Sequence, residues 1–186
     1  MTPAEKPERS HEQTFRWSAV DGTSSELCNL AFENEGWTAD GQISAPDVHW
    51  VLRVTAGWEL RQFMLFRDLP EADLWLATDG RGRWLEVNGA VRDDLRGCSD
   101  VHLPDTPFPY SIPMRRLDLP VGEGIEIETA VVDTTTLGIL PTSLHYRRVA
   151  PDRWTVRHPA PGPTVELTVD PSGIVVDQLG TFTRIR

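Results

Sequence analysis

Hydrophobic and polar residues alternate with a period of two along most of this chain, which is typical of half-buried β-strands. In the stretch 165–169, for example, Val165, Leu167 and Val169 alternate with Glu166 and Thr168. The same alternation, rich in β-branched and aromatic residues, predicts strands at 15–19, 26–32, 37–45, 48–55, 58–66, 74–78, 83–87, 125–131, 144–149, 154–158, 165–169, 174–176 and 181–185.

Turn-forming residues separate these segments at short intervals. Asp, Asn, Gly and Pro favour tight turns, and they predict turns at 21–22, 56–57, 79–82, 88–89, 150–152 and 170–173. Short strands spaced about 8–12 residues apart favour an antiparallel sandwich or barrel. The strand 58–66 is apolar on both faces, which indicates a sheet covered on both sides or curled around a filled interior.

The segment 97–119 is the exception to this pattern, because it holds four prolines and cannot be a central strand. We expect one helical turn within 104–113, with Thr106 as N-cap and Pro107 at the first helical position. Pro113 disfavours helical geometry at the residue before it, so we expect an extended strand over 114–119. The only other helical-period stripe is 67–76.

In a strand over 114–119, Arg115 would share a face with Leu117 and Leu119 and would lie against apolar surface. A guanidinium in that position needs an oxygen partner. The residues alone leave two interpretations open. Arg115 forms a structural ion pair with Asp100 or Glu26, or it anchors an anionic or hydroxyl-rich ligand head group.

Composition and charge then narrow the class of partner. The chain has 186 residues, 39% hydrophobic residues and seven tryptophans, which is enough for one globular domain with a real core. Its formal net charge is −10 and it has no dense basic stripe, so nucleic acid and anionic membrane surfaces are poor partners. No apolar run approaches the length of a membrane span, so no integral membrane association is expected.

Residues 1–13 are polar and contain no apolar signal-peptide core, so we expect a disordered N-terminal tail followed by one β domain over 14–186. The cysteines, Cys28 and Cys98, lie in no metal-binding spacing and require no disulfide. We therefore expect a cytoplasmic protein with no bound metal and no cofactor.

Candidate chemistry is sparse. The sequence contains no GxSxG, HExxH, Walker or GxGxxG motif. Asp100 and His102 would share one face of an extended segment, and a carboxylate beside an imidazole can act as an acid–base pair. An ordinary hydrogen bond in a loop is the more common outcome, so we assign no catalytic residue.

The aromatic residues point to binding instead. The tryptophans all fall in predicted strands, where most should pack in the core. Their number exceeds what a small closed barrel holds, so some rings should line a cavity, together with a few placed polar groups. The candidate ligand-binding residues are Trp58, Arg61, Trp84, Asp100, Tyr110 and Arg115.

The segment 97–123, GCSDVHLPDTPFPYSIPMRRLDLPVGE, resembles the signature of DUF1089, a bacterial family labelled Putative glycolipid-binding. The shared pattern is Gly-Cys-x-Asp-x-x-Leu, then Thr-Pro-Phe-x-x-x-x-Pro-x-Arg-Arg-Leu and a following Gly. WELR at 58–61, DGRGRW at 79–84 and VELTVDPSGIV at 165–175 also fit, so the resemblance spans most of 14–186. The family usually has Thr-Asn-Thr after the Phe, where this chain has Pro109, Tyr110 and Ser111, so no contact from that Asn carries over.

The resemblance implies a curled β-sheet like that of the periplasmic lipoprotein carriers, with a cavity suited to a lipid. The predicted fold is therefore mostly β, a single antiparallel sheet curled into an open or split barrel, with one short helical, Pro-rich segment near 104–113. The favoured function is non-enzymatic binding of an amphipathic small molecule such as a glycolipid. The alternatives are a hydrolase-type enzyme that uses Asp100 and His102 on a sugar or acyl substrate, and a structural or protein-interaction module.

Overall fold

The computed structural model describes residues 12–68 and 70–185 of the chain. Within these residues the secondary structure consists of strands, two short 3-10 helices and one α-helix. The strands are β1 (Glu12–Ala19), β2 (Ser25–Glu33), β3 (Gly36–Ser44), β4 (Asp47–Thr55), β5 (Leu60–Phe66), β6 (Leu74–Thr78), β7 (Trp84–Glu86), β8 (Asp100–His102), β9 (Gly124–Val132), β10 (Ile139–Ala150), β11 (Arg153–Arg157), β12 (Thr164–Val169), β13 (Val175–Gln178) and β14 (Phe182–Ile185). The helices are η1 (Asp93–Leu95), η2 (Phe108–Tyr110) and α1 (Ser111–Leu117).

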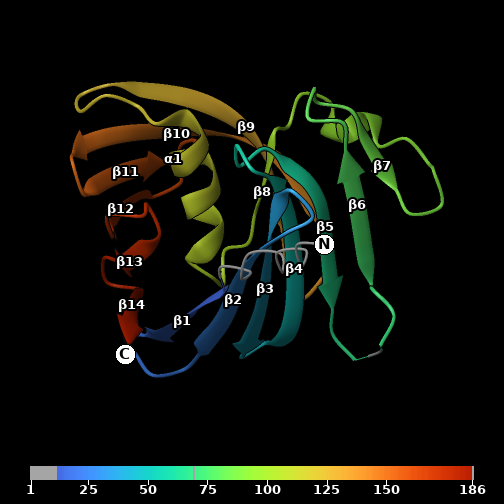
Figure 1. Ribbon diagram of the computed structural model, residues 1–186, viewed down its shortest axis with the longest axis horizontal. Helices are drawn as coiled ribbons and strands as arrows, with labels where there is room; N and C mark the ends of the chain where they lie inside the picture. The colour runs from blue at the N-terminus through green and yellow to red at the C-terminus, as the bar shows by residue number, and fades with distance from the viewer. Residues whose placement is uncertain (1–11, 69, 186) are drawn as a thin grey trace, which may run out of the picture.

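All the strands belong to one sheet with the order β7-β6-β5-β4-β3-β2-β1-β14-β13-β12-β11-β10-β9-β8. The sheet curls around α1, which stands between β9–β13 on one side and β2–β5 on the other (Figure 1). The ends of the sheet, β7 and β8, do not pair with each other, so the barrel is open. The predicted mostly β, curled open sheet is therefore confirmed. One detail differs, because β8 pairs with β9 in parallel whereas the other neighbouring strands pair antiparallel.

The inner face of the sheet is set by cross-strand rows of apolar residues. Cys28, Gly41 and Trp50 are partners in adjacent strands, and the side chain of Trp50 is fully buried. A Cβ atom at position 41 would come within 2.1 Å of the Trp50 ring. Gly41 is thus required because it leaves the space that the indole occupies, although glycine inside a strand lowers its intrinsic preference for that structure.

The Pro-rich segment 97–119, which we call the central segment, fills the concave side of this sheet. The Phe108 ring lies 5.6 Å from the Trp50 ring and 6.3 Å from the Trp17 ring, measured between centroids. Thr106 donates a hydrogen bond to the carboxyl group of Glu26 on β2, and both residues are buried. The centre of the barrel is therefore occupied by the protein's own side chains, and any ligand site must lie nearer its rim.

The predicted strand over 114–119 is wrong, because these residues continue the helical segment as α1. Pro113 lies in the first turn of α1, where a backbone N–H has no intrahelical acceptor and its loss costs little. The helix ends at Asp118, whose φ of 42° is left-handed, a conformation that aspartate tolerates.

Two further expectations concern the helical stripe at 67–76 and the N-terminal tail at 1–13. The predicted helical stripe at 67–76 is not a helix in the described residues, which form bends and irregular chain until β6 begins at Leu74. The expected disordered tail, residues 1–13, falls outside the described residues except for Glu12 and Gln13, which belong to β1.

Candidate functional site

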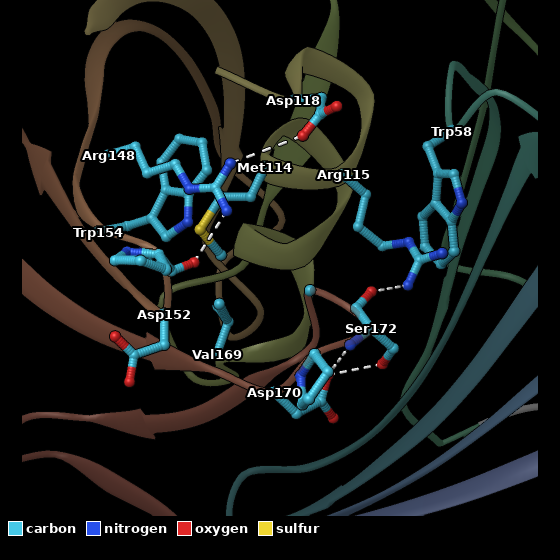
Figure 2. A pocket seen from close by; sticks show the side chains of 13 residues that line it. Trp58, Met114, Arg115, Asp118, Arg148, Asp152, Trp154, Val169, Asp170 and Ser172 are labelled. Atoms are coloured by element: carbon cyan, nitrogen blue, oxygen red, sulfur yellow. Dashed lines mark hydrogen bonds and ion pairs between the residues drawn. The ribbon is translucent and has the colours of Figure 1, made fainter. Parts of the chain in front are cut away.

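An open pocket of about 600 Å³ lies at the rim of the barrel, beside the last turn of α1. Its other walls are the β10–β11 turn, the β12–β13 turn and Trp58 from the β4–β5 turn (Figure 2). We name this site the α1 pocket. Its lining residues are Trp58, Met114, Arg115, Asp118, Arg148, Pro151, Asp152, Trp154, Val169, Asp170, Pro171, Ser172 and Gly173.

Arg115 lies between Trp58 and the β12–β13 turn. Its guanidinium carbon lies 4.0 Å from the centroid of the Trp58 ring, and its Nη1 donates a hydrogen bond to the carbonyl oxygen of Ser172. Among the described residues no carboxylate forms an ion pair with Arg115. Partial burial lowers the pKa of Arg115, and the nearby charge of Asp170 opposes this change. The site therefore holds a partly desolvated cation that is fixed by an aromatic ring and a carbonyl and forms no ion pair with the other described residues.

Trp58 is positioned by an unusual backbone conformation. Its φ of 65° lies in the left-handed region, which is rare for a bulky residue. The Trp58 N–H donates to the carbonyl of Thr55, 2.9 Å away, and the ring stacks on Trp37 with a centroid distance of 5.5 Å. Trp37 thus covers one face of the Trp58 indole while Arg115 covers another part of its surface. This buried residue serves to orient the guanidinium more than to offer an open aromatic face.

A second arginine–tryptophan pair stands on the opposite wall. The guanidinium carbon of Arg148 lies 5.7 Å from the centroid of the Trp154 ring. Its two terminal nitrogens donate to the carbonyl oxygens of Leu119 and Pro151, each at 2.9 Å, and Nη1 lies 3.6 Å from Oδ1 of Asp118. Arg148 is therefore mostly occupied in joining the end of α1 to the β10–β11 turn.

Acidic groups complete the α1 pocket. The carboxylates of Asp118 and Asp152 are solvent-exposed at its mouth. Asp170 organises the β12–β13 turn, because its carboxylate accepts from Ser172, from the N–H of Ile174 and from Arg184. Burial raises the pKa of Asp170, but these hydrogen bonds and the Arg184 charge outweigh it, so that the pKa is lowered overall. The pocket thus combines donors with acceptors, which suits a ligand that is rich in hydroxyl groups.

The structure brings together two of the six predicted ligand-binding residues, Trp58 and Arg115, in the α1 pocket. Arg61 points elsewhere and forms an ion pair with Glu59, at 2.8 Å. Trp84 is fully buried and donates its Nε1–H to the carbonyl of Cys98, at 2.8 Å.

The remaining two predicted ligand-binding residues, Asp100 and Tyr110, do not line the α1 pocket. Asp100 is buried and accepts hydrogen bonds from both terminal nitrogens of Arg116, at 2.9 and 2.7 Å. Tyr110 is buried with its hydroxyl 3.3 Å from Nε2 of His158, and burial raises its pKa. Of the two interpretations of Arg115, the ion pair with Asp100 or Glu26 is wrong, because Arg115 contacts Trp58 and the carbonyl of Ser172. The helical geometry of α1 turns the neighbouring Arg116 toward Asp100 instead.

His102 does not form the expected pair with Asp100. Both residues lie on β8 and are buried, but no hydrogen bond joins them among the described residues. The imidazole of His102 packs on the Tyr110 ring at a centroid distance of 4.3 Å, and burial lowers its pKa to about 3. The neighbouring charge of His158 contributes to the same direction. The imidazole is therefore neutral near pH 7, and the carboxylate is engaged by Arg116.

The sequence pattern does not predict several residues of the pocket, notably Met114, Arg148, Asp152 and Trp154. The turn at 150–152 was recognised, but the pattern within one hairpin does not reveal which other hairpin it faces. The described residues contain no group of three or more His, Cys, Asp or Glu side chains that could hold a metal ion. In the same part of the chain no helix has the length and apolar character needed to cross a membrane.

The fold and the pocket define a class of protein, a single curled β-sheet around a short helix with an open pocket at its rim. The chain belongs to the family described as Putative glycolipid-binding, whose model matches residues 14–184. The crystal structure of a DUF1089 family protein from Pseudomonas aeruginosa is similar in fold, with a TM-score of 0.68 and 24% sequence identity. The similarity covers 100% of this chain and 98% of that one. No curated protein matches this sequence.

Proposed function

We propose that this protein binds an amphipathic, glycolipid-like ligand and holds its sugar head group in the α1 pocket. The observation that carries the proposal is Arg115. It lines the pocket, is partly desolvated and stacks on Trp58, and no carboxylate of the described residues neutralises it. A guanidinium in this state forms strong hydrogen bonds with ligand oxygens.

The mixed charge of the pocket supports a sugar rather than a simple anion. Each sugar hydroxyl both donates and accepts, so it needs the two kinds of partner side by side. Arg115 supplies donors, while Asp118 and Asp152 supply acceptors at the mouth. A fully charged anion would meet repulsion from these carboxylates, whereas a polyol would satisfy both sets.

The apolar part of the ligand has a matching surface. Met114, Trp154 and Val169 line the pocket and also belong to the hydrophobic cluster beneath it. A volume of about 600 Å³ lies within the range of small-molecule sites, roughly 300–1,000 Å³. The first part of an acyl chain can thus lie on this floor while the head group faces Arg115. The interior of the barrel, which Phe108 and its neighbours fill, is not required.

Native mass spectrometry of gently purified protein, followed by titration with a glycolipid panel, tests this proposal. We expect a bound glycolipid mass in the wild-type protein and at least about a tenfold weaker affinity in Arg115→Gln, because a charge-assisted anchor is lost. Arg157→Gln is the matched control, since Arg157 is an exposed arginine of β11 that does not line the pocket. Apo spectra throughout the panel, or equal binding by the Arg115 variant, would reject the proposal.

A further inference from the structure

A second, smaller hollow lies apart from the α1 pocket, between the β6–β7 hairpin and the segment around η1. Its volume is about 260 Å³, and four of its eight lining residues are arginines, Arg81, Arg83, Arg92 and Arg96. Asp93 is the single acidic residue in that lining. We name this site the arginine hollow.

Two of the four arginines already have carboxylate partners. Arg92 donates to Asp94 at 2.9 and 2.7 Å and to Glu86 at 3.2 Å. Arg96 forms an ion pair with Asp93 at 2.5 Å. The positive charges of Arg92 and Arg96 are therefore neutralised by neighbouring carboxylates. These two side chains line the hollow, but their N–H groups are largely occupied.

Arg81 and Arg83 are different, because their guanidinium groups form no hydrogen bond and no ion pair with other described residues. The acidic residue of their own loop, Asp79, is engaged by the backbone. Its Oδ1 accepts from the N–H of Arg81 at 2.7 Å and from the N–H of Arg83 at 3.2 Å. Arg81 and Arg83 thus line the hollow as exposed cations whose guanidinium donors bond to no other described residue, with the charge of Asp79 nearby.

The loop that carries these two arginines is fixed in place. Gly82 lies between them with a φ of 84°, and its carbonyl accepts from the N–H of Gly97 at 3.0 Å. A Cβ atom at position 82 would meet the Cα of Gly97 at 2.9 Å, so the two backbones are in close contact. Preorganisation of this kind reduces the entropy lost when a ligand binds.

We infer that the arginine hollow binds an oxyanion, and specifically a phosphate monoester, through Arg81 and Arg83. Each guanidinium presents parallel N–H donors that match two oxygens of a phosphate, and a dianion best offsets two unpaired cations. The hollow is too small for a whole lipid, so it takes the phosphate and the carbons next to it. The lining of the α1 pocket holds three aspartates, Asp118, Asp152 and Asp170, against two arginines, so it would disfavour the same group.

Inorganic phosphate and glycerol 3-phosphate, titrated at constant ionic strength with chloride as reference, provide the first arm of the test. We expect saturable shifts in the amide signals of Arg81, Gly82 and Gly97 and in the backbone amide signal of Trp84, a residue that lines the hollow. The double variant Arg81→Gln/Arg83→Gln should bind at least about tenfold more weakly. The double control Arg53→Gln/Arg157→Gln removes the same net charge at positions outside the hollow and should bind like the wild-type protein.

Vesicles of phosphatidylcholine, with and without phosphatidic acid, provide the second arm and distinguish a lipid phosphate from a soluble one. Binding to phosphatidic acid vesicles that requires Arg81 and Arg83 would support the inference and identify a lipid source. Saturable binding of the soluble probes alone would support it with a soluble source. The inference is overturned if neither probe saturates and neither vesicle binds, or if the double variant and its control behave alike.

Discussion

The α1 pocket and the arginine hollow use the same side chain for different chemistry. In the α1 pocket Arg115 and Arg148 are stacked near indole rings, and carboxylates stand at the mouth. In the arginine hollow Arg81 and Arg83 form no cation–π contact and no ion pair with the described residues, the charge of Asp79 lies near both, and the lining carries one acidic residue. The net charge of −10 therefore describes the surface as a whole and does not decide which ligand a given hollow accepts.

The two sites also differ in how the chain builds them. The α1 pocket gathers residues from 58 to 173, and one wall is the helix that continues the central segment. The arginine hollow comes from one stretch, residues 81–96. Changes that loosen the central segment should consequently affect the α1 pocket and spare the arginine hollow.

Substitution of Glu26 should have the largest effect on the free energy of unfolding. Burial raises its pKa from 4.5 to about 8, although the hydrogen bond from Thr106 opposes this change. Because the folded state holds the proton more tightly, the stabilisation from this group is complete below pH 4.5 and is lost as the pH rises through about 8. Glu26→Gln should remove this loss, and at pH 9 its free energy of unfolding should exceed that of the wild-type protein by up to about 5 kcal/mol.

Urea denaturation between pH 5 and 9 measures this difference, with Glu33→Gln, an exposed position on the same strand, as control. Hydrogen exchange corrected for pH should show that α1 loses protection in the wild-type protein before the 79–83 loop does. A wild-type stability that stays level from pH 5 to 9 would show that Glu26 is not a buried neutral acid.

Substitution of Arg116 should have the second-largest effect on the free energy of unfolding. Its bidentate contact with Asp100 is largely buried, with side-chain exposures of 19% and 3%. Arg116→Met leaves a buried carboxylate without its partner and should lower the free energy of unfolding by about 3–5 kcal/mol. Arg96→Met is the comparison in the arginine hollow, because its exposed pair with Asp93 should contribute only about 0–1 kcal/mol. Similar losses in the two variants, measured by urea denaturation, would contradict the assignment of Asp100 and Arg116 as a structural pair.

Gly82 should have the smallest effect on stability and the most local one. Gly82→Ala places a side chain at a φ of 84° and against Gly97, which should cost about 1–2 kcal/mol. Phosphate binding should weaken while alkyl glucoside binding stays unchanged. Gly57→Ala, where the nearest atom to a new Cβ is 3.8 Å away, is the control for both measurements. Weakened binding at both sites would show that the two hollows are coupled.

Much of the sheet could be predicted from the sequence, because strand alternation and turn residues are local signals. The observed strand β4 is one residue longer than the predicted strand 48–55. The observed strand β12 is likewise one residue longer than the predicted strand 165–169. The turn at 170–173 also lies where Asp170 and Gly173 indicated, and Asp170 accepts the hydrogen bonds that close it.

The candidate site was only partly predictable, because it depends on contacts between distant segments. The rule that proline ends a helix led to the wrong structure at 114–119, since η2 places Pro113 in the first turn of α1. Because this segment is helical, Arg116 and not Arg115 contacts Asp100. The left-handed backbone of Trp58, which aims its ring at Arg115, has no signal in the local pattern.

The most direct test of a sugar site at Arg115 is a titration with octyl glucoside below its micelle concentration, followed through the indole N–H signals of the seven tryptophans. We predict saturable shifts of Trp58 and Trp154, which line the α1 pocket, and their loss in Arg115→Gln. Trp17 and Trp50, buried in the core, should not move. Shifts confined to other tryptophans, or shifts of Trp58 and Trp154 that persist in Arg115→Gln, would contradict the account.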